Sequence, residues 1–105
     1  MIDICNLKRY FEEDMVFITN HASERFRQRS IRTKDIREAV LSGEIIEQYS
    51  DDYPFPSCLI LGYTYDKVPL HVVMSEEGTG SRIITAYFPN LKKWECDYRT
   101  RKEQS

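Results

Sequence analysis

The first part of the chain repeats apolar residues with the period of an α-helix. Ile4, Leu7 and Phe11 recur at steps of three and four, which predicts a short amphipathic helix over about residues 2–13. The apolar stretch 15–18 that follows is too short for a helix of its own, and we expect it to be extended.

Two further helices are predicted from their capping residues. Thr19 or Asn20 is a good N-cap for a helix that runs to about Arg29. Thr33 is then expected to cap a third helix, which ends at Gly43, where a C-terminal cap belongs.

Beyond Gly43 the period changes to that of strands. One short segment rich in β-formers, 44–49, and three longer ones, 58–65, 70–76 and 81–88, are predicted strands. The sequence therefore predicts an α+β fold, in which N-terminal helices pack on an antiparallel meander of three to four strands. A single domain covering residues 1–105 fits this length.

The last fifteen residues are polar apart from three positions. Two of these, Trp94 and Tyr98, are four residues apart, which predicts a short packed helix followed by a frayed tail.

The last two predicted strands are joined by the turn signal Gly78-Thr79-Gly80. A three-residue loop there places His71 opposite Tyr87 and Val73 opposite Thr85. One face of the sheet is then expected to show His71, Ser75, Thr85 and Tyr87, and the other Leu70, Val72, Met74, Ile84, Ala86 and Phe88. A slip of one residue would reverse the faces.

Several classes of protein are disfavoured by the composition. No apolar run reaches the ~18–20 residues of a membrane helix, and no basic stretch leads into an apolar one at the N-terminus, so neither a membrane anchor nor a secretory signal is expected. The three cysteines are far apart and form no cluster with histidine, which disfavours a metal site; no cofactor motif was found either. Free thiols fit a reducing cytoplasm.

The charge of the chain is unevenly distributed. The net charge of -2 argues against a uniformly basic nucleic-acid binder. Residues 21–37, however, carry six basic and two acidic side chains, 38–52 carry five acidic ones, and 92–102 carry five basic and two acidic ones. These blocks are either solvated helix faces or local sites for anionic and cationic partners.

Three of the basic side chains form a row on the second predicted helix. His21, Arg25 and Arg29 are spaced by four and share one face, beside the apolar stripe of Ala22 and Phe26. Guanidinium groups in such a row suit phosphate, which arginine binds in a bidentate manner. The alternative is that the arginines pair with nearby acids, such as Glu47.

The predicted neighbours His71 and Tyr87 are candidates for general acid–base chemistry on a phosphodiester. A metal-independent ribonuclease needs a base for the 2′-hydroxyl, cations for the phosphate oxygens and an acid for the leaving oxygen. The alternative is a hydrogen-bonded pair that closes the sheet, since a lone histidine in a strand is more often structural.

The chain resembles the bacterial domain-of-unknown-function 4258 family over about residues 15–101. The stretches that carry the resemblance are HASERFRQRSI (21–31), DI (35–36), SGEII (42–46), PS (56–57), LG (61–62), PLHVV (69–73) and ITAY (84–87), followed by Pro89 and Trp94. Ser30 replaces a glycine that is usual in the family, and Asn90 replaces an acidic residue.

The resemblance implies a fold distantly like that of the small RelE/ParE-like and BrnT-like toxins, with small antitoxin-like proteins as partners. The family's recurring positions correspond here to His21, Arg25, Arg29, His71, Tyr87, Pro89 and Trp94. We interpret Pro89 and Trp94 as structural.

Three hypotheses of function follow. The first is a toxin-like, metal-independent ribonuclease or RNA-binding protein: His71 or His21 would act as base or acid, Arg25 and Arg29 would hold phosphate, Tyr87 would orient or donate a proton, and Arg101 would add charge. The second is a non-catalytic protein-interaction module, and the third is an enzyme with a small anionic substrate.

Overall fold

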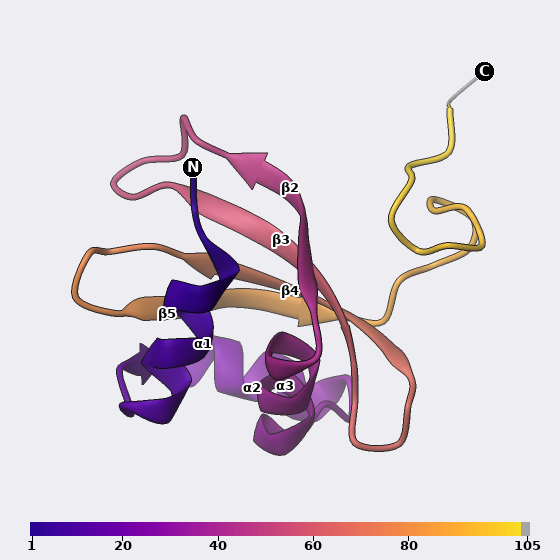
Figure 1. Ribbon diagram of the computed structural model, residues 1–105. Helices are drawn as coiled ribbons and strands as arrows, with labels where there is room; N and C mark the ends of the chain where they lie inside the picture. The colour runs from indigo at the N-terminus through magenta and orange to yellow at the C-terminus, as the bar shows by residue number, and fades with distance from the viewer. Residues whose placement is uncertain (104–105) are drawn as a thin grey trace.

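A computed structural model describes residues 1–103 and contains three helices and five strands. The helices are α1 (Ile4–Glu12), α2 (Asn20–Gln28) and α3 (Thr33–Leu41), and the strands are β1 (Val16–Phe17), β2 (Glu44–Tyr49), β3 (Ser57–Tyr63), β4 (Pro69–Ser75) and β5 (Ser81–Tyr87). The helices are grouped together, and the C-terminal stretch, in yellow, stands apart from them beyond the strands (Figure 1). The α+β class predicted from the periodicity is thereby confirmed.

The strands form one mixed sheet in the order β1-β5-β4-β3-β2. Strands β2 to β5 are the predicted antiparallel meander. The fifth strand, β1, pairs in parallel with β5 through Val16 and Ser81 and through Phe17 and Arg82. The predicted meander is thus present with four strands, and the sheet has one strand more than predicted, because the two-residue β1 is too short to show a periodicity.

Side-chain caps set the helix starts. The Thr19 hydroxyl accepts a hydrogen bond from the backbone N–H of Ala22 at 3.1 Å, which confirms Thr19 as the N-cap of α2. Thr33, by contrast, is the first residue inside α3, and Arg32 is its N-cap. The prediction of Thr33 as the cap was wrong because the Asp35 carboxylate reaches back and accepts from the Arg32 backbone N–H at 3.1 Å.

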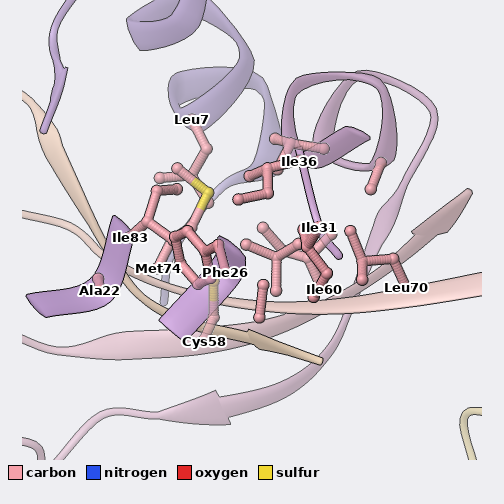
Figure 2. Packing of buried hydrophobic residues seen from close by; sticks show 14 of the residues in the cluster. Leu7, Ala22, Phe26, Ile31, Ile36, Cys58, Ile60, Leu70, Met74 and Ile83 are labelled. Atoms are coloured by element: carbon pink, nitrogen blue, oxygen red, sulfur yellow. The ribbon is translucent and has the colours of Figure 1, made fainter. Parts of the chain in front are cut away.

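The helices cover one face of the sheet, which we call the helix face. Its core contains Leu7, Ala22, Phe26, Ile31, Ile36, Cys58, Ile60, Leu70, Met74 and Ile83 (Figure 2). Each fully buried aliphatic side chain contributes about 1.5–3 kcal/mol. Helix α3 approaches β3 most closely at Gly62, where a Cβ would lie 1.7 Å from the Ala39 carbonyl oxygen. This contact requires glycine.

The register of β4 and β5 confirms part of the predicted pairing. His71 lies opposite Tyr87 and Val73 opposite Thr85, but the register then shifts, so that Met74 lies opposite Ile83. Ile83 is buried in the helix-face core, whereas Ile84 is 48% exposed. Placing Ile84 on the same face as Leu70, Val72 and Met74 was therefore wrong, because a β-bulge moves the core position by one residue.

The helix predicted around Trp94 and Tyr98 does not form. Residues 88–103, which we call the C-terminal segment, fold into turns closed by an antiparallel bridge between Trp94 and Arg101. The Asp97 carboxylate accepts hydrogen bonds from the backbone N–H groups of Arg99 and Thr100, both at 3.0 Å. This local capping stabilises a turn in place of a helix.

Among the described residues, no helix combines the length and apolar character that crossing a bilayer requires.

Candidate functional site

His71 lies on the face of the sheet opposite the helices, which we call the far face. Its Nε2 is 2.6 Å from the backbone carbonyl oxygen of Tyr98, and its Nδ1 is 3.3 Å from the Tyr87 hydroxyl. Because a carbonyl only accepts, Nε2 carries the proton and Nδ1 accepts from the Tyr87 O–H group. His71 is fully buried, and this burial lowers the pKa of its imidazole. At pH 7 the ring is neutral.

The C-terminal segment covers this histidine. The Trp94 ring meets the His71 ring edge to face, with centroids 4.5 Å apart, and Trp94 is itself buried. The Trp94 ring also contacts Arg101, whose guanidinium carbon lies 4.6 Å from the ring centroid. While the segment is in place, a ligand cannot reach the His71 ring.

Arg101 is fixed by an acidic side chain of β2. Its Nε and Nη2 donate to the two carboxylate oxygens of Glu47 at 2.8 and 3.0 Å. These hydrogen bonds lower the pKa of Glu47. Tyr49, two residues along the strand, donates to the same carboxylate, and its burial raises the pKa of the phenol to about 12. We call Glu47, His71, Tyr87 and Arg101 the far-face cluster.

The basic row of α2, His21, Arg25 and Arg29, divides into two parts. His21 and Arg25 are exposed, and within residues 1–103 neither forms a side-chain hydrogen bond or an ion pair. Arg29 is half-buried and donates from Nη1 to the Ala86 carbonyl at 2.8 Å and to the Thr85 hydroxyl at 3.3 Å. Arg29 therefore satisfies a backbone carbonyl near the C-terminal end of β5.

The structure brings three of the six predicted site residues together. His71, Tyr87 and Arg101 belong to the far-face cluster, whereas His21 and Arg25 lie on α2. Arg29 connects the two regions, because Thr85 lies two residues before Tyr87 on the same side of β5, about 6.6 Å along the strand. The suggested pairing of Arg25 or Arg29 with Glu47 was wrong, since Glu47 binds Arg101.

Sequence reasoning missed Glu47 and Tyr49 as members of this region. Both lie on β2, and a register shift between Ile45 and Glu47 separates them from the start of the strand. Their spacing of two was a usable signal, because it places both side chains on one face. Which face they share depends on the bulge, which the sequence does not show.

A comparison with protein families gives a match over most of this chain. The family described as "Domain of unknown function (DUF4258)" matches residues 18–88. The chain belongs to the DUF4258 family. No curated protein and no solved structure gives a significant match.

The DUF4258 match includes the basic row, His71 and Tyr87 and ends at residue 88, where the C-terminal segment begins. Trp94 and Arg101, which cover His71, are thus outside the matched stretch. The matched stretch therefore contributes the sheet with His71 and Tyr87 on its far face, and helix α2 with its exposed cations on the helix face.

The chemistry available at the far face is that of a proton relay. The Tyr87 hydroxyl donates its hydrogen to the buried imidazole of His71. The lone pairs of the phenolic oxygen therefore remain free to accept a hydrogen bond or a proton. Tyr87 is half-buried, so it is the member of the pair that a ligand can reach. Among the described residues, no group of three or more histidine, cysteine or acidic side chains could hold a metal ion.

Proposed function

We propose that this DUF4258 protein is a toxin-like RNA-binding protein with a RelE-like arrangement of helices on a sheet, and that it cleaves RNA without a metal. The observation that carries the proposal is the hydrogen bond between His71 and Tyr87 on the far face. Arg29 links this face to α2, whose cations His21 and Arg25 are unpaired within residues 1–103. Exposed cations without an acidic partner remain available to bind phosphate.

In the proposed reaction, a 2′-hydroxyl of the RNA attacks the adjacent phosphorus and the bond to the 5′-oxygen breaks. Tyr87 accepts the proton of the 2′-hydroxyl while its own proton passes to Nδ1 of His71. The products are a 2′,3′-cyclic phosphate and a 5′-hydroxyl, whose proton comes from water. Arg101 supplies positive charge for the oxygens of the reacting phosphate, and Arg25, on α2, binds another phosphate of the same strand.

Binding is tested first, with a fluorescently labelled single-stranded RNA and anisotropy at two salt concentrations. We expect Arg25→Ala to weaken binding about ten-fold and to reduce the salt slope by about one. Arg27→Ala is the matched control, since it removes the same charge from the same helix at a side chain that already pairs with Glu24. Equal binding by the wild type and Arg25→Ala, or no binding at all, would overturn the proposed phosphate contact.

Cleavage is tested with the same RNA in the presence of a chelator. We expect Tyr87→Phe to abolish cleavage and Tyr53→Phe, at a tyrosine that is 94% exposed in the β2–β3 loop, to leave it unchanged. If the wild type binds this RNA without cleaving it, the proposed ribonuclease activity is overturned and the proposed RNA binding stands.

A second candidate function is a non-catalytic protein-interaction module. It is favoured by the complete burial of His71 and by exposed apolar side chains on the β1 and β5 strands, Phe17 at 53% and Ile84 at 48%. A small antitoxin-like protein with acidic side chains would fit these and the adjacent cations of α2. Tight binding of such a protein, with no affinity for RNA, would favour this function over the first.

A further inference from the structure

A separate groove lies between the C-terminal half of α3 and the hairpin that joins β3 to β4. It has a volume of about 530 Å³ and is lined by Glu38, Ser42, Tyr63, Thr64, Tyr65 and Lys67. Its two tyrosines are largely exposed, Tyr63 at 44% and Tyr65 at 66%. The far-face cluster contributes no residue to it.

The hairpin holds both tyrosines outward. Thr64, between them, is buried; its hydroxyl accepts from the backbone N–H of Val68 at 3.1 Å, and its N–H donates to the Val68 carbonyl at 2.8 Å. Tyr63 is the last residue of β3, and Tyr65 lies in the turn that follows, which a hydrogen bond from the Lys67 N–H to the Thr64 carbonyl closes at 2.9 Å. Both tyrosine side chains line the groove.

The groove is also fixed to α3. The Ser42 hydroxyl donates to the Glu38 backbone carbonyl at 2.8 Å and accepts from the Tyr63 backbone N–H at 3.3 Å. The wall that carries the tyrosines is therefore tied to the wall that carries Glu38. A preformed groove loses little entropy when a planar ligand enters it.

The charges of the groove match the groups of a nucleotide. Lys34 lies with its ammonium 5.2 Å from the centroid of the Tyr65 ring, and neither Lys34 nor Lys67 forms a salt bridge in the described part of the chain. Both are available to a phosphate. The Glu38 carboxylate, also without an ion pair among residues 1–103, can accept from the amino group of a base.

The groove lies at the same end of the sheet as the far-face cluster. Tyr63 pairs with Pro69 at the start of β4, and His71, two residues later, pairs with Tyr87 at the end of β5. In addition, Arg32 in the connection between α2 and α3 binds Asp66 of the hairpin at 3.1 Å. A single-stranded RNA that contacts the end of α2 thus has the groove within reach.

We propose that this groove is a binding site for single-stranded RNA, in which one amino-bearing base stacks on Tyr65 while Lys34 and Lys67 bind the flanking phosphates. The proposal rests on the proposed function only for the identity of the ligand as RNA. The residues and the surface are different, and the groove adds stacking on an aromatic ring to its phosphate contacts, whereas the contacts of α2 are electrostatic alone.

The test titrates the full chain with labelled single-stranded octanucleotides of RNA, one of cytidines and one of uridines. We expect Tyr65→Leu to weaken binding of the cytidine RNA at least about five-fold, the lower end of what stacking of one base contributes, and Tyr65→Phe to retain it. Glu38→Gln should reduce the preference for cytidine over uridine. Tyr53→Leu, at the exposed loop tyrosine, should bind like the wild type.

The outcomes separate this proposal from the proposed function. If Arg25→Ala weakens RNA binding and Tyr65→Leu does not, the proposed groove site is overturned and the proposed phosphate contact on α2 stands. If Tyr65→Leu weakens RNA binding and Arg25→Ala does not, the groove site is supported and the proposed phosphate contact on α2 is overturned. A wild type that binds neither RNA would overturn both. Because Tyr65 is mostly exposed, its variants are expected to fold, and their circular dichroism and thermal unfolding check this.

Discussion

His71 donates a hydrogen bond of 2.6 Å from Nε2 to the carbonyl of Tyr98, 27 positions later in the chain. This contact ties the middle strand of the meander to the C-terminal segment. With Nδ1 engaged by Tyr87, both nitrogens of this fully buried ring have a hydrogen-bond partner. In this arrangement the histidine orients the Tyr87 hydroxyl and holds the segment, and Tyr87 is the more exposed of the two side chains.

The buried neutral His71 predicts that the protein loses stability in mild acid. Burial lowers the pKa of His71 in the folded state, while the unfolded chain titrates near 6.5. The unfolded state therefore binds more protons below that pH, and the free energy of unfolding falls as the pH drops from about 6.5 towards the folded-state pKa, by at most about 1.4 kcal/mol per pH unit. Urea denaturation at pH 8, 7, 6 and 5 measures this slope.

The control for this prediction is the other histidine. His71→Gln should remove the slope between pH 7 and 5, whereas His21→Gln, at an exposed position on α2, should keep it. An NMR titration of the His71 ring in the wild type reads the same pKa without any substitution. A His71 ring that titrates at or above 6.5 would contradict the neutral, buried state.

The ion pair between Arg101 and Glu47 predicts a fluorescence change in the single tryptophan. Removing the guanidinium in Arg101→Ala frees one end of the C-terminal segment, so buried Trp94 should become more exposed and its emission should move to longer wavelength. Because the Arg101 side chain is 59% exposed, we expect a loss of only about 1 kcal/mol of stability. Emission unchanged from the wild type would show that the segment is held without this pair.

Arg82→Ala is the matched control for Arg101→Ala. Arg82 also pairs with a glutamate, Glu77, at 3.8 Å, and its side chain is 52% exposed. It lies at the other end of β5, beside β1, so its removal should leave the emission of Trp94 unchanged. A double-mutant cycle of Arg101→Ala with Glu47→Gln then isolates the coupling of the pair.

The elements that the sequence predicted correctly are those with a strong local signal. The cap at Thr19 and the opposition of His71 and Tyr87 follow from side-chain chemistry and from the length of one turn. Ile84 was assigned to the wrong face of the sheet because a β-bulge shifts the register, and no residue type in this part of the sequence signals the bulge. The bridge of Trp94 to Arg101 was missed because it depends on Glu47, 54 residues away from Arg101, and no local pattern encodes that contact.

The site was predictable to the same extent. His71 and Tyr87 were found because strand pairing alone brings them together, whereas the distance of His21 from them depends on how α2 packs on β5. Ser30, where the family usually has glycine, adopts a φ of 58°, so the left-handed turn after α2 forms without glycine.

The close contact of α3 with β3 predicts a severe effect of Gly62→Ala. A Cβ at this position would lie 1.7 Å from the Ala39 carbonyl oxygen, and the surroundings are backbone that cannot rotate away. We expect a loss of about 3 kcal/mol or more, measured by thermal or urea unfolding. Gly78→Ala is the control: nothing lies within 4 Å of its Cβ, and its φ of 84° alone should cost about 1 kcal/mol. Equal losses in the two variants would contradict the close approach.

The three cysteines predict a reactivity pattern that reports on the core. Cys58 is fully buried on β3, and burial raises the pKa of its thiol to about 12, so at pH 8 only about one in ten thousand of these thiols is ionised. Cys5 and Cys96 are exposed. A disulfide reagent should therefore react rapidly with two thiols in the native protein and with three in denaturant.

The control is Cys58→Ala, which should show two reactive thiols under both conditions. The slow labelling of Cys58 in the wild type then measures the opening of the helix-face core. Prompt labelling of all three thiols under native conditions would contradict the packing of β3 against α3.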